Sequence, residues 1–299
     1  MASYSFDWVD AFTDRGFGGN PCVVVHDAED VSLEDRLALV RETSLSECAY
    51  LVPSDRADFG VRYYLADREI LFAGHPTVAT IVSLVARGKI ALDEAPVQCT
   101  LEVGSGVIPI EVARDEAGRP VVTMTQARPE FGRRHDPGAI AAIYGLSADE
   151  IVGTPQTVST GTPFCIAVLA SRQALDRAVL DPAGLQAFRA ADGHALADLM
   201  EPFLVVREGA TAAGDTYARL LLAPPLPAED PFTGSATGCM AAYLWANGLI
   251  DRPGFIAEQG HGMGRPGRAT VEVLGPKDDI AGIRVGGTGV VLMQGTLTL

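Results

Sequence analysis

Two segments of this chain, residues 76–86 and 236–246, carry small or apolar side chains around their whole circumference when drawn as helices. A helix of this kind is buried on every side, because no face of it offers polar groups to water. Each segment therefore predicts a central helix with a sheet wrapped around it. This requirement restricts the possible folds more than any other feature of the sequence.

The two segments also resemble each other at an offset of 160 residues. The register pairs Phe72 with Phe232, Gly74 with Gly234, Thr77 with Thr237, Leu84 with Leu244, Ala86 with Ala246 and Gly88 with Gly248. Upstream, Gly19-Asn20-Pro21 and Gly161-Thr162-Pro163 form a second matching pair, and each precedes an apolar run. Self-similarity of this kind indicates an internal repeat. We therefore predict an α+β protein of two repeated domains, each a curled, mostly antiparallel sheet around a central buried helix.

The domain boundaries follow from breaks in the pattern. We expect the first domain to comprise residues 1–125 and the second residues 126–285, with the Pro- and Gly-containing stretch 126–138 as the crossing between them. Gly286-Gly287 breaks the chain before a final strand, residues 286–299, which we expect to return and complete the first sheet. The active site is expected in the cleft between the two domains.

Short β-like runs dominate the rest of the chain, and three helices have marked starts. Ser32 followed by Asp35 resembles a capping box, and Asp136-Pro137 and Asp181-Pro182 place a capping residue before a helix-starting proline. The runs that predict strands are 4–12, 22–26, 48–52, 59–65, 107–112, 121–124, 165–169, 203–206, 217–222 and 289–299.

Composition excludes several classes of function. The chain has 299 residues, 47% of them hydrophobic, which is enough for a substantial core. Its net charge is −15 and its basic residues are scattered, so a nucleic-acid partner is not expected. The apolar runs fall short of the roughly 20 residues that span a bilayer, and the N-terminus lacks the features of a signal peptide. We expect no membrane association and a cytoplasmic location.

Metals and organic cofactors are not predicted either. The five cysteines are odd in number and contain no Cys-x-x-Cys pair, and no two of the five histidines stand three or four residues apart. Lys89 and Lys277 are the only lysines, and both lie in sequence too polar for a desolvated Schiff base.

The starts of the two apolar helices have a composition that suits an anion. Gly74-His75-Pro76 and Gly234-Ser235-Ala236 would turn free backbone N–H groups and the positive end of each helix dipole toward a carboxylate. The alternative is that these residues only cap their helices.

Three side chains near these starts are candidates for proton transfer. His75 stands at the first start, Asp230 lies just before the second, and Glu47 lies at the mouth of an apolar strand, where desolvation would raise its pKa. The alternatives are a structural histidine, an aspartate that forms a turn before proline, and a glutamate at an exposed edge.

Taken together, these motifs resemble a known family. They are Gly19-Asn20-Pro21, Leu45-Ser46-Glu47, Gly74-His75-Pro76, Glu229-Asp230-Pro231-Phe232-Thr233-Gly234-Ser235-Ala236 and Gln259-Gly260 with Gly264-Arg265-Pro266. In order and spacing they resemble the PhzF-like family of phenazine biosynthesis, over essentially the whole chain. The resemblance implies the diaminopimelate epimerase fold, with two similar domains and an active site between them.

The resemblance further implies a cofactor-independent isomerase that acts on a small, cyclic carboxylate, as the family's trans-2,3-dihydro-3-hydroxyanthranilate isomerase does. The family's catalytic glutamate corresponds to Glu47, and its active-site histidine and aspartate to His75 and Asp230. Asn20, Gly74, Gly234 and Ser235 are then expected to bind the substrate. Relatives often pair through sheet edges, so a homodimer is expected.

Other readings of the same fold remain open. Related epimerases use two cysteines near the helix starts, but Ala73 and Ser235 occupy those places here and Cys239 lies about one helical turn further along. This disfavours a two-thiol racemase. A hydrolase that cleaves a carbon–carbon bond and a non-catalytic small-molecule binder remain as alternatives.

Overall fold

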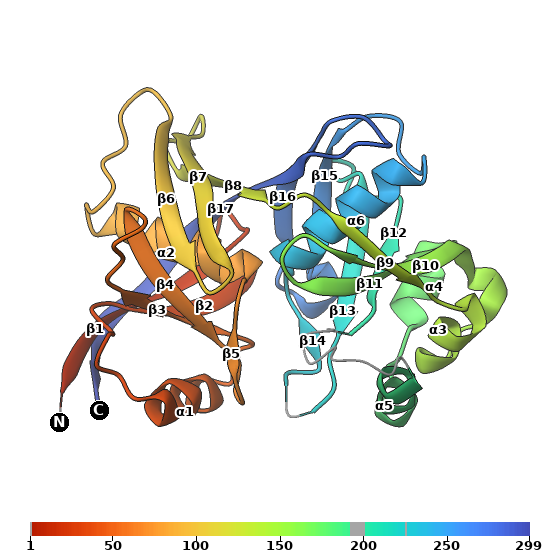
Figure 1. Cartoon of the computed structure of the whole chain (residues 1–299), viewed down its shortest axis with the longest axis horizontal. Helices are drawn as coiled ribbons and strands as arrows, with labels where there is room; N and C mark the ends of the chain where they lie inside the picture. Colours follow the sequence, from red (N-terminus) through yellow and green to blue (C-terminus); the bar gives the residue numbers. More distant parts are fainter. Residues whose placement is uncertain (1, 192–200, 225) are drawn as a thin grey trace. The chain divides into compact units, whose positions relative to one another are not determined.

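The computed structural model describes residues 2–191, 201–224 and 226–299 (Figure 1). The chain forms two compact units: Met1–Thr125 together with Val285–Leu299, and the continuous segment Gln126–Arg284. In the part of the chain that is described, no helix is both long enough and apolar enough to cross a membrane.

The first unit is a mostly antiparallel sheet. Its strands pair in the order β1–β2–β3–β4–β6–β7–β8, with β2–β3 and β4–β6 parallel and the other pairs antiparallel. Its elements are β1 (Ser3–Ala11), β2 (Asn20–Val25), α1 (Leu33–Thr43), β3 (Cys48–Val52), β4 (Phe59–Tyr64), β5 (Glu69–Ile70), α2 (Gly74–Ala86), β6 (Val97–Val103), β7 (Gly106–Arg114) and β8 (Pro120–Gln126).

The central helix of this unit is α2, and it is buried as the sequence predicts. Residues 74–84 are all buried, and the helix packs against β1, β2 and β3 (Figure 1). It begins at Gly74, two residues before the predicted apolar segment, and Gly88, with φ +68°, ends it in the left-handed conformation. The first unit therefore places the N-terminus of a helix that is buried over its first eleven residues close to the starts of β2 and β3.

The last strand, β17 (Gly282–Thr298), returns to the first unit and pairs antiparallel with β1, from Ser3 opposite Thr298 to Ala11 opposite Gly289. The predicted break at Gly286-Gly287 is wrong, because β17 runs through it without interruption. Close packing explains the glycine: a Cβ on Gly287 would lie 2.4 Å from the ring of Phe12. Gly287 therefore allows close packing against Phe12 and does not interrupt the strand.

The second unit repeats this arrangement. Its strands pair in the order β9–β10–β11–β12–β13–β15–β16, with β11–β12 and β13–β15 parallel, as in the first unit. Its elements are β9 (Glu130–Arg134), α3 (Pro137–Ile143), β10 (Ile151–Ser159), β11 (Pro163–Leu169), α4 (Arg172–Arg177), α5 (Pro182–Ala191), β12 (Phe203–Val206), β13 (Thr216–Leu221), β14 (Glu229–Asp230), α6 (Gly234–Ala246), β15 (Gly254–Gln259) and β16 (Gly267–Leu274), with short 3₁₀ turns at Ala148–Glu150 and His261–Met263.

Helix α6 corresponds to α2 in length, in burial and in the way it ends. Both have thirteen residues, both are buried over their first eleven, and both end at a glycine with positive φ, Gly88 or Gly248. Thr77 and Thr237 each donate a hydrogen bond from the side chain back to the carbonyl oxygen four residues earlier, at 2.6 and 2.9 Å. The repeat seen in the sequence is thus a repeat of backbone structure.

Several segments of the second unit differ from expectation, among them β15 and β16, which no predicted strand covers. The predicted crossing, residues 126–138, contains β9, which pairs antiparallel with β10. Strand β10 itself is not predicted, because Gly153 and Pro155 within it read as a turn. Both lie in a bulge where the pairing with β11 shifts between Val152 and Gln156, and bulges are where strands accept such residues.

Candidate functional site

In the first unit, three of the predicted site residues lie together at the start of α2. Nδ1 of His75 is 3.0 Å from Nδ2 of Asn20 and 3.7 Å from Oε2 of Glu47. Asn20 opens β2, and Glu47 immediately precedes β3. Since β2 and β3 are parallel neighbours, their beginnings share one edge of the sheet, and α2 packs on both strands. The fold brings these three side chains to one place.

The protonation state of His75 follows from its surroundings. The residue is only 3% exposed, and burial lowers its pKa from 6.5 to about 3, so the imidazole is neutral near pH 7. An amide nitrogen can only donate, so Nδ1 accepts from Asn20 and the ring proton lies on Nε2. Nε2 has no hydrogen-bond partner among the described residues. His75 thus carries an N–H donor available to a ligand.

Glu47 lies at the boundary between this group and the apolar core. Its side chain is 15% exposed, and its negative charge helps to raise the pKa of the buried Cys22 thiol and of the Tyr63 hydroxyl, in both of which burial is the main cause. Tyr63 in turn shares a 2.8 Å hydrogen bond with Thr77 of α2. A carboxylate so placed is largely removed from bulk water, which suits a group that exchanges a proton with carbon.

The other predicted site residues lie at the start of α6 in the second unit. Asp230 ends β14 and is 4% exposed, and Oγ1 of Thr233 donates to its Oδ2 at 2.6 Å. Thr233 is the residue that precedes α6, and Gly234 and Ser235 are the first two residues of the helix. Asp230, Gly234 and Ser235 thus form one group at a helix N-terminus, as Gly74 and His75 do in the first unit.

Gln259, at the end of β15, is hydrogen-bonded to this second group more extensively than its sequence motif indicates. Gln259, which is 1% exposed, donates from Nε2 to the carbonyl oxygen of Asp230 at 2.8 Å and to Oγ1 of Thr233 at 3.1 Å. Its Oε1 accepts from the backbone N–H of Thr233 at 3.0 Å. All three of these hydrogen bonds end on the segment that carries Asp230.

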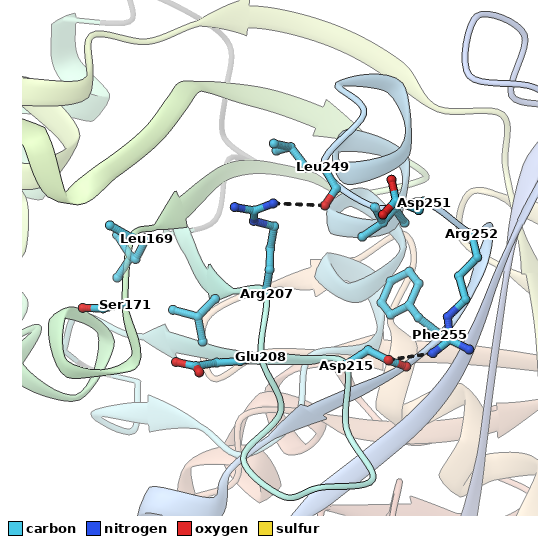
Figure 2. Close-up of a pocket in the computed structure, with 12 residues that line it drawn as sticks. Leu169, Ser171, Arg207, Glu208, Asp215, Leu249, Asp251, Arg252 and Phe255 are labelled. Carbon is cyan, nitrogen blue, oxygen red and sulfur yellow. Dashed lines mark hydrogen bonds and ion pairs between the residues drawn. The ribbon is translucent and has the colours of Figure 1, made fainter.

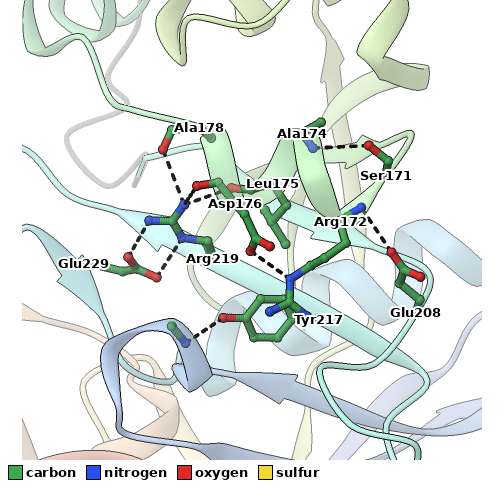
Figure 3. A network of polar contacts seen from close by, with 11 residues as sticks. Ser171, Arg172, Ala174, Leu175, Asp176, Ala178, Glu208, Tyr217, Arg219 and Glu229 are labelled. Atoms are coloured by element: carbon green, nitrogen blue, oxygen red, sulfur yellow. Dashed lines mark hydrogen bonds and ion pairs between the residues drawn. The ribbon is translucent and has the colours of Figure 1, made fainter.

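A network of polar contacts holds the neighbouring residue of β14 (Figure 3). Arg219 binds both carboxylate oxygens of Glu229, at 3.0 and 2.7 Å, and donates to the carbonyl oxygen of Leu175 at 2.8 Å. Beside it, the guanidinium of Arg172 stacks 3.9 Å from the centre of the Tyr217 ring. The network fixes the backbone of β14 on the side of Glu229.

The sequence did not single out Glu201, which is the structural counterpart of Glu47. Glu47 lies three residues before Tyr50 of β3, which is paired with the fourth residue of β4. Glu201 lies three residues before Leu204 of β12, which is paired in the same way with the fourth residue of β13. Glu201 is buried, forms an ion pair with Arg189 and accepts a backbone N–H, so its carboxylate is held by its own unit. Among the residues that the structure describes, Glu47 is the counterpart that has a histidine nearby, at 3.7 Å.

A cavity of about 740 Å³ lies elsewhere in the second unit (Figure 2). None of the predicted site residues lines it. Both of its arginines are engaged within the protein: Arg252 pairs with Asp215 at 2.6 Å, and Arg207 donates to the carbonyl oxygen of Leu249 at 3.4 Å. The cavity is therefore separate from the groups at the starts of α2 and α6.

Cys239 of α6 is buried, and burial raises its pKa to about 11. Its Sγ lies 3.4 Å from Oγ1 of Thr160 and 3.5 Å from the carbonyl oxygen of Thr162. At neutral pH the group is a thiol, and a thiol is a poor base and nucleophile. The geometry favours a packing role.

Comparison with known proteins agrees with the fold and with the family resemblance. Residues 9–295 match the PhzC-PhzF family model, described as phenazine biosynthesis-like protein. The trans-2,3-dihydro-3-hydroxyanthranilate isomerase of Pseudomonas aeruginosa is 28% identical over 290 residues, which are 96% of each chain.

Solved structures extend the agreement. A phenazine biosynthesis protein of the PhzF family from Bacillus anthracis superposes over the full length of both chains with a TM-score of 0.85 and 24% identity. A hydroxyproline epimerase from Agrobacterium vitis matches 99% of this chain and 93% of its own, with a TM-score of 0.67 and 14% identity, and so shares the fold. The predicted epimerase-like α+β fold is confirmed. The chain belongs to the PhzC-PhzF family of phenazine biosynthesis-like proteins and is an isomerase.

Proposed function

We propose that this isomerase moves a proton between two carbons of a small, cyclic carboxylate, of the type represented by trans-2,3-dihydro-3-hydroxyanthranilate. The observation that carries the proposal is the group at the start of α2, where the Glu47 carboxylate lies 3.7 Å from a buried, neutral histidine. The name of the Pseudomonas aeruginosa relative supports the class of substrate.

In the proposed reaction, the Glu47 carboxylate removes a proton from a carbon next to a conjugated system. The electron pair of the broken C–H bond moves through the conjugated system, and the resulting Glu47 carboxylic acid gives the proton to a second carbon. Glu47 returns to its starting state, and the substrate is neither oxidised nor reduced. General acid–base catalysis of this kind contributes about 10²–10⁴-fold to a rate.

His75 is proposed to hold the substrate in place as a neutral donor. Its Nε2–H would donate to a substrate oxygen, while Asn20 keeps Nδ1 occupied and the ring orientation fixed. A neutral imidazole next to Glu47 also does not present the positive charge that would weaken the basicity of this carboxylate.

The second group is proposed to complete the site from the other domain. Asp230 would position the substrate or relay a proton, and the backbone N–H groups at Gly74, Gly234 and Ser235 would hold the substrate carboxylate. We propose that the cleft between the domains, residues 1–125 with 286–299 and residues 126–285, contains the substrate.

The direct test is conversion of trans-2,3-dihydro-3-hydroxyanthranilate, followed by NMR in D₂O. Isomerisation predicts a single product of unchanged carbon skeleton, with deuterium at the carbon that receives the proton wherever Glu47 exchanges with solvent. Absence of conversion, under conditions in which the Pseudomonas aeruginosa relative is active, would exclude this substrate. A second product fragment would instead indicate carbon–carbon bond hydrolysis.

We also propose that the protein is cytoplasmic and that it forms a homodimer, the latter because members of the family often pair through sheet edges. Light scattering tests the oligomeric state, since a monomer has a mass of 31.4 kDa and a dimer twice that value. A monomeric mass at working concentration would contradict the proposal.

A further inference from the structure

The internal repeat allows each residue of the Asp230 segment to be compared with its counterpart in the first unit. The offset of 160 residues pairs Asp230 with Ile70 and Thr233 with Ala73. The sheets agree with this register, because Ile70 lies opposite Tyr63 in β4 and Asp230 lies opposite Leu220 in β13, each the fifth residue of its strand.

The same registers identify the counterpart of Gln259. In the parallel pair β4–β6, Gly60 lies opposite Glu102, and in β13–β15, Tyr217 lies opposite Glu258. Gly60 and Tyr217 are each the second residue of their strand. Gln259, the residue after Glu258, therefore corresponds to Val103.

Some contacts in this region occur in both units and belong to the shared fold. Arg62 lies 3.7 Å from Glu69 in the first unit, as Arg219 lies 2.7 Å from Glu229 in the second. Gly104 follows β6 and Gly260 follows β15, and each lies close to the segment before the buried helix of its unit. A Cβ on Gly104 would lie 2.9 Å from Leu71, and a Cβ on Gly260 would lie 2.5 Å from the carbonyl oxygen of Pro231.

Other contacts occur in the second unit alone. The three positions occupied by Asp230, Thr233 and Gln259 carry Ile70, Ala73 and Val103 in the first unit. The first unit nevertheless forms the same short strand, the same turn and the same thirteen-residue buried helix. The polar trio is therefore not needed to build this part of the fold.

The hydrogen bonds of the trio run in one direction. The amide nitrogen of Gln259 can only donate, so Oγ1 of Thr233 accepts from it and turns its own proton toward Oδ2 of Asp230. The same amide nitrogen donates to the carbonyl oxygen of Asp230, and Oε1 receives the N–H of Thr233. Gln259 thereby fixes the backbone at both ends of the 230–233 turn and the carboxylate rotamer between them.

We propose that Gln259 is a positioning residue for the reaction, which acts through Thr233 to hold the Asp230 carboxylate in its productive orientation. The inference rests on the proposed function in that Asp230 is taken to contact the substrate. Misplacing a catalytic group by about 1 Å costs on the order of 10²-fold in rate.

The first experiment is Gln259→Met, assayed with trans-2,3-dihydro-3-hydroxyanthranilate. We expect kcat to fall on the order of 10²-fold with little change in KM, because substrate binding does not depend on the orientation of Asp230 alone. The matched control is Gln156→Met: Gln156 is buried in the same unit and donates a 3.0 Å hydrogen bond to the carbonyl oxygen of Gly132. This control should leave kcat within a few-fold of wild type.

The second experiment distinguishes positioning from general stabilisation. If Gln259 acts through Asp230, then Gln259→Met made in an Asp230→Asn protein should cause no further loss of kcat. A structural role would instead reduce kcat by the same factor in both backgrounds. Multiplicative losses would overturn the proposal.

A third variant keeps the proposal testable if Gln259→Met fails to fold or the chosen substrate is not turned over. The triple substitution Asp230→Ile, Thr233→Ala, Gln259→Val copies the residues with which the first unit forms this turn, and it should fold with a wild-type circular dichroism spectrum. A triple variant that does not fold would show that the trio is structural. If wild type is inactive on this compound, crystal structures of wild type and Gln259→Met decide: an unmoved Asp230 carboxylate would refute the inference.

Discussion

Nδ1 of His75 lies 3.0 Å from the side-chain amide of Asn20, and this single contact determines which nitrogen of the ring carries the proton. Asn20 comes from β2 and His75 from α2, fifty-five residues further along the chain. The bond is buried, so water does not compete for it. The neutral histidine that results has consequences for stability as well as for binding.

His75 predicts a loss of stability in mild acid. Burial lowers the pKa of His75 in the folded protein to about 3, whereas its pKa in the unfolded chain is about 6.5. At pH values between 3 and 6.5, the unfolded chain therefore binds a proton at this residue and the folded protein does not. The stability contributed by the neutral ring is complete above pH 6.5 and is lost as the pH falls. From pH 7 to pH 5 the loss is about 2 kcal/mol.

Urea unfolding of wild type and His75→Gln at both pH values measures this effect. The variant should lose less stability than wild type on acidification, by about 2 kcal/mol. His26, whose pKa is also lowered mainly by burial, contributes to both proteins and cancels in the comparison. Equal pH dependence of the two proteins would contradict the assignment.

Glu47→Gln should abolish the proposed base while retaining size and fold. We expect turnover to fall roughly 10²–10⁴-fold with little change in KM, the range for loss of general acid–base catalysis. The matched control is Glu201→Gln, the counterpart carboxylate that Arg189 holds in the other unit. That variant should lose stability and keep turnover; a Glu47→Gln enzyme of near-normal turnover would remove Glu47 from the mechanism.

Cys239→Ala tests the rival mechanism in which a thiol transfers the proton. Because burial raises the pKa of this cysteine to about 11, we expect turnover to remain within an order of magnitude of wild type. A modest loss of thermal stability is expected from the smaller side chain in the packed helix. A folded variant without activity would return the interpretation to thiol-based epimerisation.

Exhaustive dialysis against EDTA should leave turnover unchanged, and added nicotinamide, flavin or pyridoxal phosphate should not increase it. Gly262, Gly264 and Gly267 have the spacing of a dinucleotide fingerprint, but the segment leads into strand β16 and not into a helix that would receive a pyrophosphate. Activity that disappears on chelation and returns with a metal would refute this expectation.

Much of the fold could be predicted from the sequence because burial on all sides of two helices is a strong and local signal. Helix caps are also local signals, and two predicted starts are confirmed. The Ser32 side chain accepts the N–H of Asp35 before α1, and the Asp136 side chain accepts the N–H of Ala139 before α3. Strand β10 was missed because its bulge places Gly153 and Pro155 where single-sequence rules expect a turn.

The site was only partly predictable. Glu47, His75 and Asp230 are predicted from their places near the two helix starts and are then matched to the family motifs, and the structure shows that the first two are neighbours. Gln259 lay within a quoted motif, yet its role depends on three hydrogen bonds between segments 26 to 29 residues apart, which no local pattern contains. The repeat register, Val103 against Gln259, is the signal that would have found it.

The pairing of β17 with β1 also bears on how this protein is made. The second unit is continuous in sequence, so it can complete all its contacts as soon as residue 284 leaves the ribosome. The first unit emerges earlier but keeps one side of β1 unpaired until residues 289–298 arrive, and an unpaired edge is open to wrong partners. For this protein, the half that is synthesised first is the half that finishes folding last.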